Sequence, residues 1–362
     1  MRTRALGIRG PGEAAILDVD LAAAGDGRFE VRTVFSGISA GTELSYLKGT
    51  NPYLEAAWDP EYGVFRRDLR AQAYPVERLG YMEVGEVAGS EVPGLEAGSR
   101  VAMAYGHRER HVADARSERY VLLPDALDPR LGIYVAHMGP ICANGLLHAA
   151  AELTRGDVRR LGDGVEGLQV LVYGGGVVGL LTGLFALEHG AAEVVVVDRT
   201  PERLAAAHAL GLGALAEDDD GPWRDVKARW RHGPGARGAD VVFQCRGQDA
   251  ALARALRCLR PQGTVIDLAF YPGGAPDLRL GEEFHHNGLT IRCAQIGRVP
   301  RGLGHSWDRD RLSRETIALL LRHGDAVLEH VLTDVVAFED GPRLLEDVAA
   351  RRRHVIQAAL AF

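Results

Sequence analysis

Cysteine is scarce in this chain of 362 residues. Only four are present, Cys142, Cys245, Cys258 and Cys293, and no two of them form a Cys-x-x-Cys pair. Scattered thiols of this kind exclude a disulfide framework and a structural zinc lobe built on four cysteines, and they are typical of a reducing compartment. We therefore expect a cytoplasmic protein.

Lysine and long apolar runs are also missing. Lysine occurs only at Lys48 and Lys227, so chemistry that needs a lysine base or a Schiff base is confined to these two positions. No apolar run is long enough to cross a bilayer, and the first twenty residues lack the apolar core of a secretion signal. We expect no membrane partner, and the formal net charge of −7 disfavours nucleic acid.

The composition is otherwise that of a globular protein with room for two domains, 46% hydrophobic and 25% charged. The first 145 residues hold short β-like runs separated by glycine and proline, which is typical of a small β-barrel. These runs are Phe29–Ser36, Val84–Ala88, Arg100–Ala104 and Tyr120–Leu123.

The most informative segment follows this part of the chain. An apolar run, Val170–Tyr173, leads into a glycine turn, a helical pattern and a second apolar run, Val194–Val197, which is closed by Asp198. Strand, glycine turn, helix, strand and acid make up the βαβ unit that binds a dinucleotide. The sequence therefore predicts a nicotinamide cofactor as a partner of this chain.

Each glycine of the turn has a separate expected role. Gly174 permits the tight turn, Gly176 lets the backbone approach the pyrophosphate, and Gly179 lets the helix pack closely on the strand. Val177 and Val178 begin the helix, whose N-terminal N–H groups attract phosphate.

Asp198 comes 24 residues after Gly174, where a carboxylate accepts hydrogen bonds from the adenosine ribose and repels a 2′-phosphate. This favours NAD, although Arg199 and Arg203 could offer charge to a phosphate and leave NADP open. Cys245 and Arg246 follow a later strand and are further candidates for cofactor binding.

Strands and helices continue to alternate after Asp198, which predicts a doubly wound parallel sheet and an α/β fold. We expect a catalytic domain at 1–145, a cofactor domain at 146–298 and a return of the chain to the catalytic domain at 299–362. The acidic run Glu217–Asp220 is interpreted as a solvated loop.

This organisation resembles the medium-chain dehydrogenase/reductase superfamily over nearly the whole chain. Segments that carry the resemblance are Val31–Ile38, Leu79–Val87, Gly98–Val101, the glycine turn and Asp240–Gly247. The resemblance implies a GroES-like barrel beside a Rossmann domain, an active site in the cleft between them, and a homodimer or homotetramer.

The zinc-binding members of that superfamily read GIC-x-[ST]-D and then GHE, whereas this chain reads GISAGTE from Gly37 and GYME from Gly80. Ser39 replaces the ligand cysteine, Tyr81 replaces the ligand histidine, and the third ligand position falls near Pro140. These side chains cannot form the usual tetrahedral site. We therefore expect no metal, and no catalytic zinc. The motifs are similar to those of bacteriochlorophyllide-type dehydrogenases, as is the stretch Gly297–Leu312.

Without zinc, oxidation of an alcohol needs another group to take the hydroxyl proton. Thr42 and Glu43 stand where the superfamily has its proton relay, with one inserted residue, or they are a barrel-turn pair bonded only to backbone. Tyr81 is a candidate acid/base or merely lines the cleft. Ser39 is expected in the substrate pocket.

Histidines and residues of the later chain add further candidates. His107 and His111 form an H-x-x-x-H pair that we interpret as part of a surface loop rather than a metal site, with His107 as a possible acid/base. His137, Asn144 and Trp307 are expected to line the substrate pocket, each with a plain packing role as the alternative.

The predicted function is a zinc-independent, NAD-linked dehydrogenase that interconverts a secondary alcohol and a ketone on a small, polar substrate such as a sugar, a cyclitol or a natural-product scaffold. The alternatives are an NADPH-dependent quinone or enone reductase and a nucleotide-binding sensor without activity.

Overall fold

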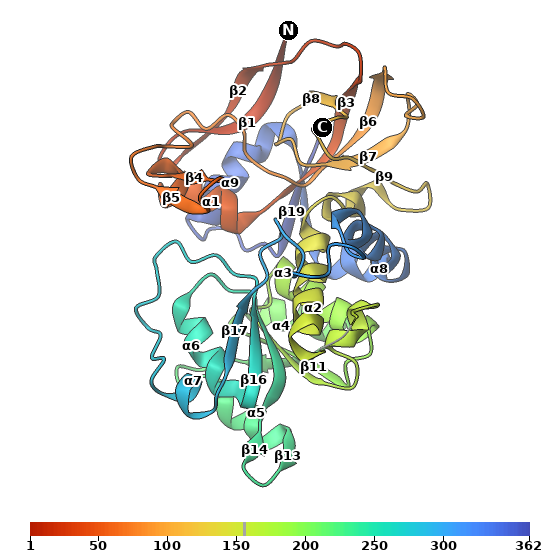
Figure 1. The fold of residues 1–362 in the computed structure, drawn as a ribbon. Coiled ribbons are helices and arrows are strands. Elements are labelled where there is room, and N and C mark those ends of the chain that lie inside the picture. Colours follow the sequence, from red (N-terminus) through yellow and green to blue (C-terminus); the bar gives the residue numbers. More distant parts are fainter. Residues whose placement is uncertain (155–156) are drawn as a thin grey trace. The chain divides into compact units, whose positions relative to one another are not determined.

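A computed structural model describes residues 1–154 and 157–362, and its contacts divide the chain into two compact units (Figure 1). The first unit comprises Met1–His137 and Leu332–Phe362, and the second comprises Met138–Val331. These boundaries differ from the expected 1–145, 146–298 and 299–362. The physical reason is that α2 (Met138–Leu153) and α8 (Arg309–His330) pack on each other within the second unit.

The first unit is built on a mixed sheet in the strand order β18-β19-β3-β6-β7-β9, with β8 also paired to β3. The bounds of these strands are β3 Arg28–Ile38, β6 Glu83–Ser90, β7 Arg100–Met103, β8 Arg110–Asp114, β9 Val121–Leu122, β18 Leu332–Ala337 and β19 Gln357–Ala361. The last two strands come from the end of the chain, so the C-terminal segment completes the N-terminal sheet. A cluster of buried apolar residues in this unit includes Leu6, Val76 and Leu360 of β19.

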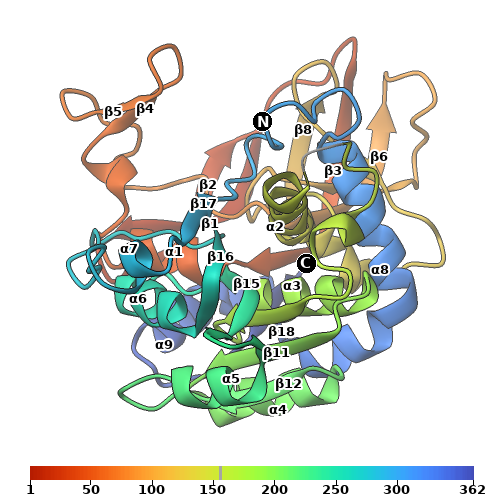
Figure 2. The ribbon, with the colours of Figure 1, turned by 60° about the horizontal axis from the view of Figure 1, so that its bottom comes forward.

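Shorter elements complete this unit. Two hairpins are formed by β1 (Arg2–Gly10) with β2 (Glu13–Asp20) and by β4 (Ala57–Asp59) with β5 (Val64–Arg66). Its helices are α1 (Ala40–Leu47) and α9 (Gly341–Ala349), with 3₁₀ turns η1 (Pro52–Leu54), η2 (Pro129–Tyr134) and η4 (Phe338–Asp340). The β4–β5 hairpin, drawn in orange in Figure 2, exposes part of Trp58 and Phe65.

The described residues of the second unit form a six-stranded sheet in the order β12-β11-β10-β15-β16-β17, and each neighbouring pair is parallel (Figure 2). This is the strand order of a Rossmann fold. The chain first adds strands on one side of β10, as β11 and β12, and then on its other side, as β15, β16 and β17. The bounds are β10 Gln169–Tyr173, β11 Glu193–Asp198, β12 Gly213–Ala216, β15 Ala239–Gln244, β16 Leu259–Asp267 and β17 Thr290–Cys293. A small hairpin joins β13 (Arg231–Gly233) to β14 (Ala236–Arg237).

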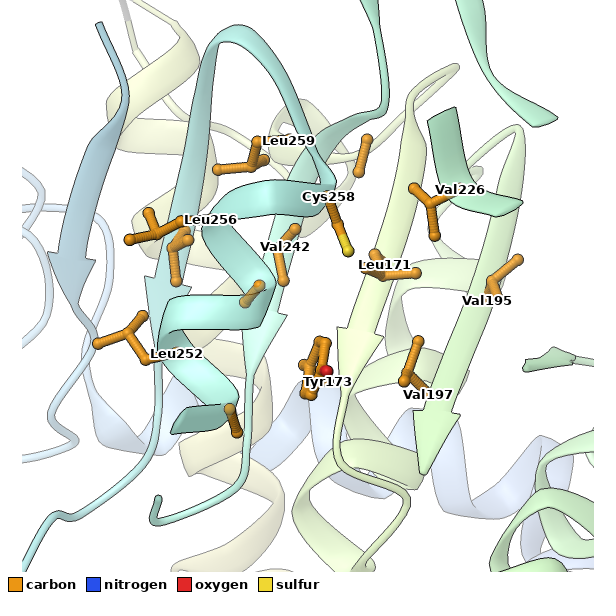
Figure 3. Close-up of a cluster of buried hydrophobic side chains, with 14 of the residues drawn as sticks. Leu171, Tyr173, Val195, Val197, Val226, Val242, Leu252, Leu256, Cys258 and Leu259 are labelled. Carbon is orange, nitrogen blue, oxygen red and sulfur yellow. The ribbon is translucent and has the colours of Figure 1, made fainter. Parts of the chain in front are cut away.

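Helices bury both faces of this sheet, which explains why its strands read as nearly continuous apolar runs. On one face, Leu171, Tyr173 and Val195 pack with Leu256 and Cys258 of α6, as Figure 3 shows. The helices and the remaining turn are α3 Val177–Glu188, α4 Pro201–Ala209, α5 Trp223–Arg229, α6 Asp249–Cys258, α7 Glu283–His286 and η3 Leu161–Gly164. None of the helices in the described part of the chain is long and apolar enough to cross a membrane.

Candidate functional site

The glycine turn of the second unit has the geometry that a dinucleotide requires. Gly174 has φ +111°, a value that glycine adopts far more readily than residues with a side chain. A Cβ on Gly179 would overlap the carbonyl oxygen of Gly174, whereas a Cβ on Gly176 would meet nothing within 4 Å. The turn is therefore closed on the helix side and open at Gly176, where a pyrophosphate can approach the backbone.

Asp198 ends β11 beside this turn. Its carboxylate accepts hydrogen bonds of 2.8 Å from the backbone N–H groups of Gly175 and Thr200, and Arg203 Nη1 lies 3.6 Å away. Burial alone would raise the pKa of Asp198, but these two backbone donors and the Arg203 charge lower it overall. The side chain is therefore an anion held beside the glycine turn.

The other expected cofactor residues also border the turn. Val177 and Val178 are the first residues of α3, with Gly176 as its N-cap. Cys245 donates its backbone N–H to Tyr173 O at 2.9 Å, and burial holds the pKa of its thiol well above the usual range. Arg246 comes next, and a Cβ on Gly174 would lie 3.2 Å from Arg246 Cβ. The residues of this turn fit a nicotinamide dinucleotide.

Glu217 borders this site, so the interpretation of Glu217–Asp220 as a solvated loop is wrong for Glu217, although Asp218, Asp219 and Asp220 are exposed as expected. Its side chain is completely buried and forms ion pairs with Arg199, Arg246 and Arg254. The residue directly follows β12. Its carboxylate can be buried because three guanidinium groups and the Tyr173 hydroxyl surround it. The missed signal is that Glu217 directly follows a strand in a βα repeat, where side chains reach the ligand edge of the sheet.

The first unit holds two neighbouring polar clusters. The outer one, here called the Ser39–Tyr81 cluster, consists of Ser39, Thr42, Tyr81 and His137. Ser39 Oγ lies 2.5 Å from the Tyr81 hydroxyl and 3.5 Å from Thr42 Oγ1. The rings of Tyr81 and His137 are 4.6 Å apart at 59°. Tyr81, Thr42 and His137 are all partly exposed, in contrast to the residues of the second cluster.

The inner one, here called the His107 cluster, consists of Ser36, Glu43, Glu83 and His107, all essentially without solvent exposure. His107 Nε2 lies 3.3 Å from Glu43 Oε1, and its Nδ1 lies 2.5 Å from Ser36 Oγ. Ser36 is paired with Glu83 across β3 and β6, and its hydroxyl donates to Glu83 Oε1 at 3.2 Å. One imidazole therefore connects two buried carboxylates.

Thr42 and Glu43, which are expected at the relay position, point in different directions on α1: Thr42 contacts Ser39 and Glu43 faces His107. One expectation for this unit needs correction. His107 is not in a surface loop, since it is 1% exposed and packs against Gly80. His111, on β8, is instead hydrogen-bonded to Glu118 at 2.7 Å.

Glu43 should make stability depend on pH. Burial raises its pKa, against the lowering effect of His107, and its Oε2 has no hydrogen-bond partner among the described residues. A carboxyl whose folded-state pKa is raised stabilises the fold below its unfolded pKa, and this contribution is lost as pH rises through the folded value.

We therefore expect Glu43→Gln, which resembles the protonated acid, to melt several degrees above the native protein at pH 8 and at the same temperature at pH 4. Thermal melts across this range provide the measurement. The exposed Glu13→Gln is the matched control and should shift neither end. A larger stabilisation at pH 4 than at pH 8 would contradict the expected direction.

The two remaining pocket candidates lie in the second unit, where the structure gives each a packing role. Asn144 is completely buried, and its Nδ2, which has two hydrogens to donate, lies 3.3–3.4 Å from the carbonyl oxygens of Ala294, Gln295 and Arg298. Trp307 is 1% exposed, donates from Nε1 to Val158 O at 2.8 Å, and carries the Arg311 guanidinium 3.6 Å above its ring. Trp307 also lines a surface hollow of about 450 Å³ with Pro300.

The chemistry of the donors at the zinc-ligand positions differs from that of a zinc site. Ser39 and Tyr81 are hydrogen-bonded to each other, and neither side chain is a thiolate, imidazole or carboxylate. Over residues 1–154 and 157–362, no three His, Cys, Asp or Glu side chains are grouped to hold a metal ion. The residues present at these positions do not fit tetrahedral zinc.

Comparisons with known proteins agree with this fold. Residues 177–305 match the family described as "Zinc-binding dehydrogenase". D-guloside 3-dehydrogenase of Escherichia coli K12 is 26% identical over 344 residues, 92% of each chain. D-xylulose reductase of Saccharomyces cerevisiae is 28% identical over 217 residues, 52% of this chain and 58% of its own. The solved alcohol dehydrogenase TADH from Thermus sp. ATN1 covers 99% of both chains with TM-score 0.75 and 20% identity.

These matches, together with the Rossmann unit and its glycine turn, show that the chain is similar to zinc-binding and alcohol dehydrogenases. The predicted α/β fold is confirmed. The relatives named here are a dehydrogenase and a reductase, and the solved structure is an alcohol dehydrogenase.

Proposed function

We propose that this protein is a metal-independent, NAD-linked dehydrogenase that interconverts a secondary alcohol and a ketone on a sugar or polyol. The observation that carries this proposal is the 2.5 Å contact between Ser39 Oγ and the Tyr81 hydroxyl, at the positions where zinc members of the superfamily have cysteine and histidine ligands. Two coupled hydroxyls can bind a substrate oxygen and move its proton, which are the tasks that zinc performs in those members.

The residues of the first unit divide these tasks. During oxidation Tyr81 receives the hydroxyl proton of the substrate as it passes its own phenolic proton to Ser39, which in turn passes a proton to Thr42 and from there to solvent. Thr42 extends this hydrogen-bond chain, and the His137 ring restricts the position of the phenol. The bound nicotinamide supplies the complementary chemistry, because it accepts the hydride.

The His107 cluster contacts Gly80, the residue that precedes Tyr81. Gly80 lies against the His107 ring, and a Cβ there would collide with it, so the imidazole limits where the adjacent Tyr81 backbone can lie. Buried polar groups that are held by several partners are rigid supports for a neighbouring site. Glu43 and His107 thus act in our proposal as positioning residues.

The substrate class follows from the polar side chains and from the relatives. Ser39, Thr42 and Tyr81 present hydroxyl groups, which pair with the several hydroxyls of a polyol. The relatives named above are dehydrogenases or reductases of a guloside and of xylulose. The preference for NAD is supported by Asp198, whose anion would repel a 2′-phosphate.

Metal analysis combined with a substrate panel tests this proposal. The purified protein is expected to contain less than about 0.1 zinc per chain, and prolonged chelation should change its activity by less than about twofold, because no step depends on a bound metal. Sugars and polyols with secondary alcohols should be oxidised with NAD⁺, while enones and quinones should not be reduced. A catalytic zinc that chelation removes along with the activity would refute metal independence, and efficient enone reduction would refute the substrate class.

A further inference from the structure

We propose that Glu217 sets the cofactor preference of this protein, because it holds Arg199 and Arg246 in ion pairs and so withholds their charge from a 2′-phosphate. This inference rests on the proposed preference for NAD. The residue that controls which cofactor binds is then a buried one, and it lies outside the glycine turn and is distinct from Asp198.

The contacts of Glu217 use both of its oxygens fully. Oε1 accepts hydrogen bonds from the Tyr173 hydroxyl at 2.5 Å and from Arg254 Nη1 at 2.9 Å. Oε2 accepts from Arg199 Nε at 2.9 Å and from Arg246 Nη1 at 2.8 Å. Burial alone would raise the pKa of Glu217, but the bond from Tyr173 and the charges of Arg246 and Arg254 lower it overall, so the group is a carboxylate.

Two of these arginines stand beside the ribose position. Arg199 directly follows Asp198 at the end of β11, and Arg246 follows β15 with its Cβ against Gly174. Their side chains are 41% and 24% exposed, whereas that of Glu217 is fully buried. Glu217 therefore cannot touch a cofactor itself and acts through the arginines, as a positioning residue.

The balance of charge explains why Glu217 matters for only one of the two cofactors. Guanidinium groups bind phosphate through paired, charge-assisted hydrogen bonds. Here Arg199 and Arg246 each direct one donor to the same carboxylate, and Asp198 adds a second anion at the ribose. NAD lacks the phosphate, so only NADP gains if the arginines are released.

The test measures the dissociation constants of NADH and NADPH by fluorescence titration of the intact protein. Glu217→Gln keeps the shape of the side chain and removes its charge. We expect it to tighten NADPH binding by about tenfold and to change NADH binding by less than about threefold. Tyr173→Phe is the matched control, because it removes one hydrogen bond to Glu217 and leaves the carboxylate, and it should leave the ratio of the two constants unchanged.

Each outcome has a distinct meaning. If the native protein prefers NADPH, the proposed function fails on its cofactor; if it prefers NADH and Glu217→Gln leaves the ratio unchanged, the inference about Glu217 fails alone. Should Glu217→Gln not fold, Arg246→Gln decides the question. Since the native arginine is engaged by Glu217, this variant should weaken NADPH binding by less than about threefold, and a loss above about tenfold overturns the proposal.

Discussion

Replacing Tyr81 by phenylalanine is expected to lower kcat by at least about 100-fold, because general acid–base groups contribute about 10²–10⁴ to rate. The variant loses the one phenolic oxygen that lies 2.5 Å from Ser39 Oγ and keeps the ring that packs beside His137. NADH binding should stay within about twofold of the native value, since Tyr81 and the glycine turn belong to different units. Steady-state kinetics on the best alcohol substrate, with a separate NADH titration, provide the measurement.

Tyr134→Phe offers a matched control in the same unit. Tyr134 is fully buried, and its hydroxyl has no hydrogen-bond partner among the described residues. Removing that hydroxyl should leave kcat unchanged and cost no stability. Metal-independent proton transfer by Tyr81 would be abandoned if Tyr81→Phe kept kcat within about twofold, and a similar loss in both variants would point to a general effect on folding.

Alanine substitutions at two glycines of the same turn should have different effects, one on stability and the other on cofactor binding. Gly179→Ala should destabilise the protein by about 2 kcal/mol or more, because the added Cβ overlaps the Gly174 carbonyl and the backbone must shift. Gly176→Ala should leave the melting temperature unchanged, since its φ of −78° suits alanine and no atom lies within 4 Å of the new Cβ. That methyl group nevertheless stands where the pyrophosphate approaches, so NADH should bind at least about tenfold more weakly.

Thermal melts and NADH titrations on both variants measure these effects. The glycine turn is not the pyrophosphate site if Gly176→Ala binds NADH as the native protein does. A Gly179→Ala variant with native stability would instead mean that α3 can move away from β10 without cost.

Much of the second unit could be predicted from sequence because its signals are local. The strands at 239–243 and 263–268 and the helix at 250–259 were expected and occur as β15, β16 and α6. The short strand β12 was missed, since Gly213–Ala216 has only four residues and none of them is β-branched or aromatic. The hairpin of β1 and β2 was missed because glycine and charged residues interrupt its apolar alternation.

The catalytic candidates show where sequence reasoning stops. Ser39, Thr42, Tyr81 and His137 were all expected near the substrate, and they lie in one cluster. Their roles stay predictions. The orientation of Glu43 could not be foreseen, because it depends on how α1 packs against β3 and on the buried imidazole that receives it.

The sequence by itself determined the cofactor unit, since strand, glycine turn, helix, strand and Asp198 lie in one continuous segment and their spacing sets their geometry. It also predicted, through the resemblance, which side chains stand at the positions of the zinc ligands. Only the tertiary structure decided the buried ion pairs. The His107 cluster joins positions 36, 43, 83 and 107, and Glu217 meets arginines up to 37 residues away. Such groups leave no local pattern, because each is buried only when distant strands bring its partners to it.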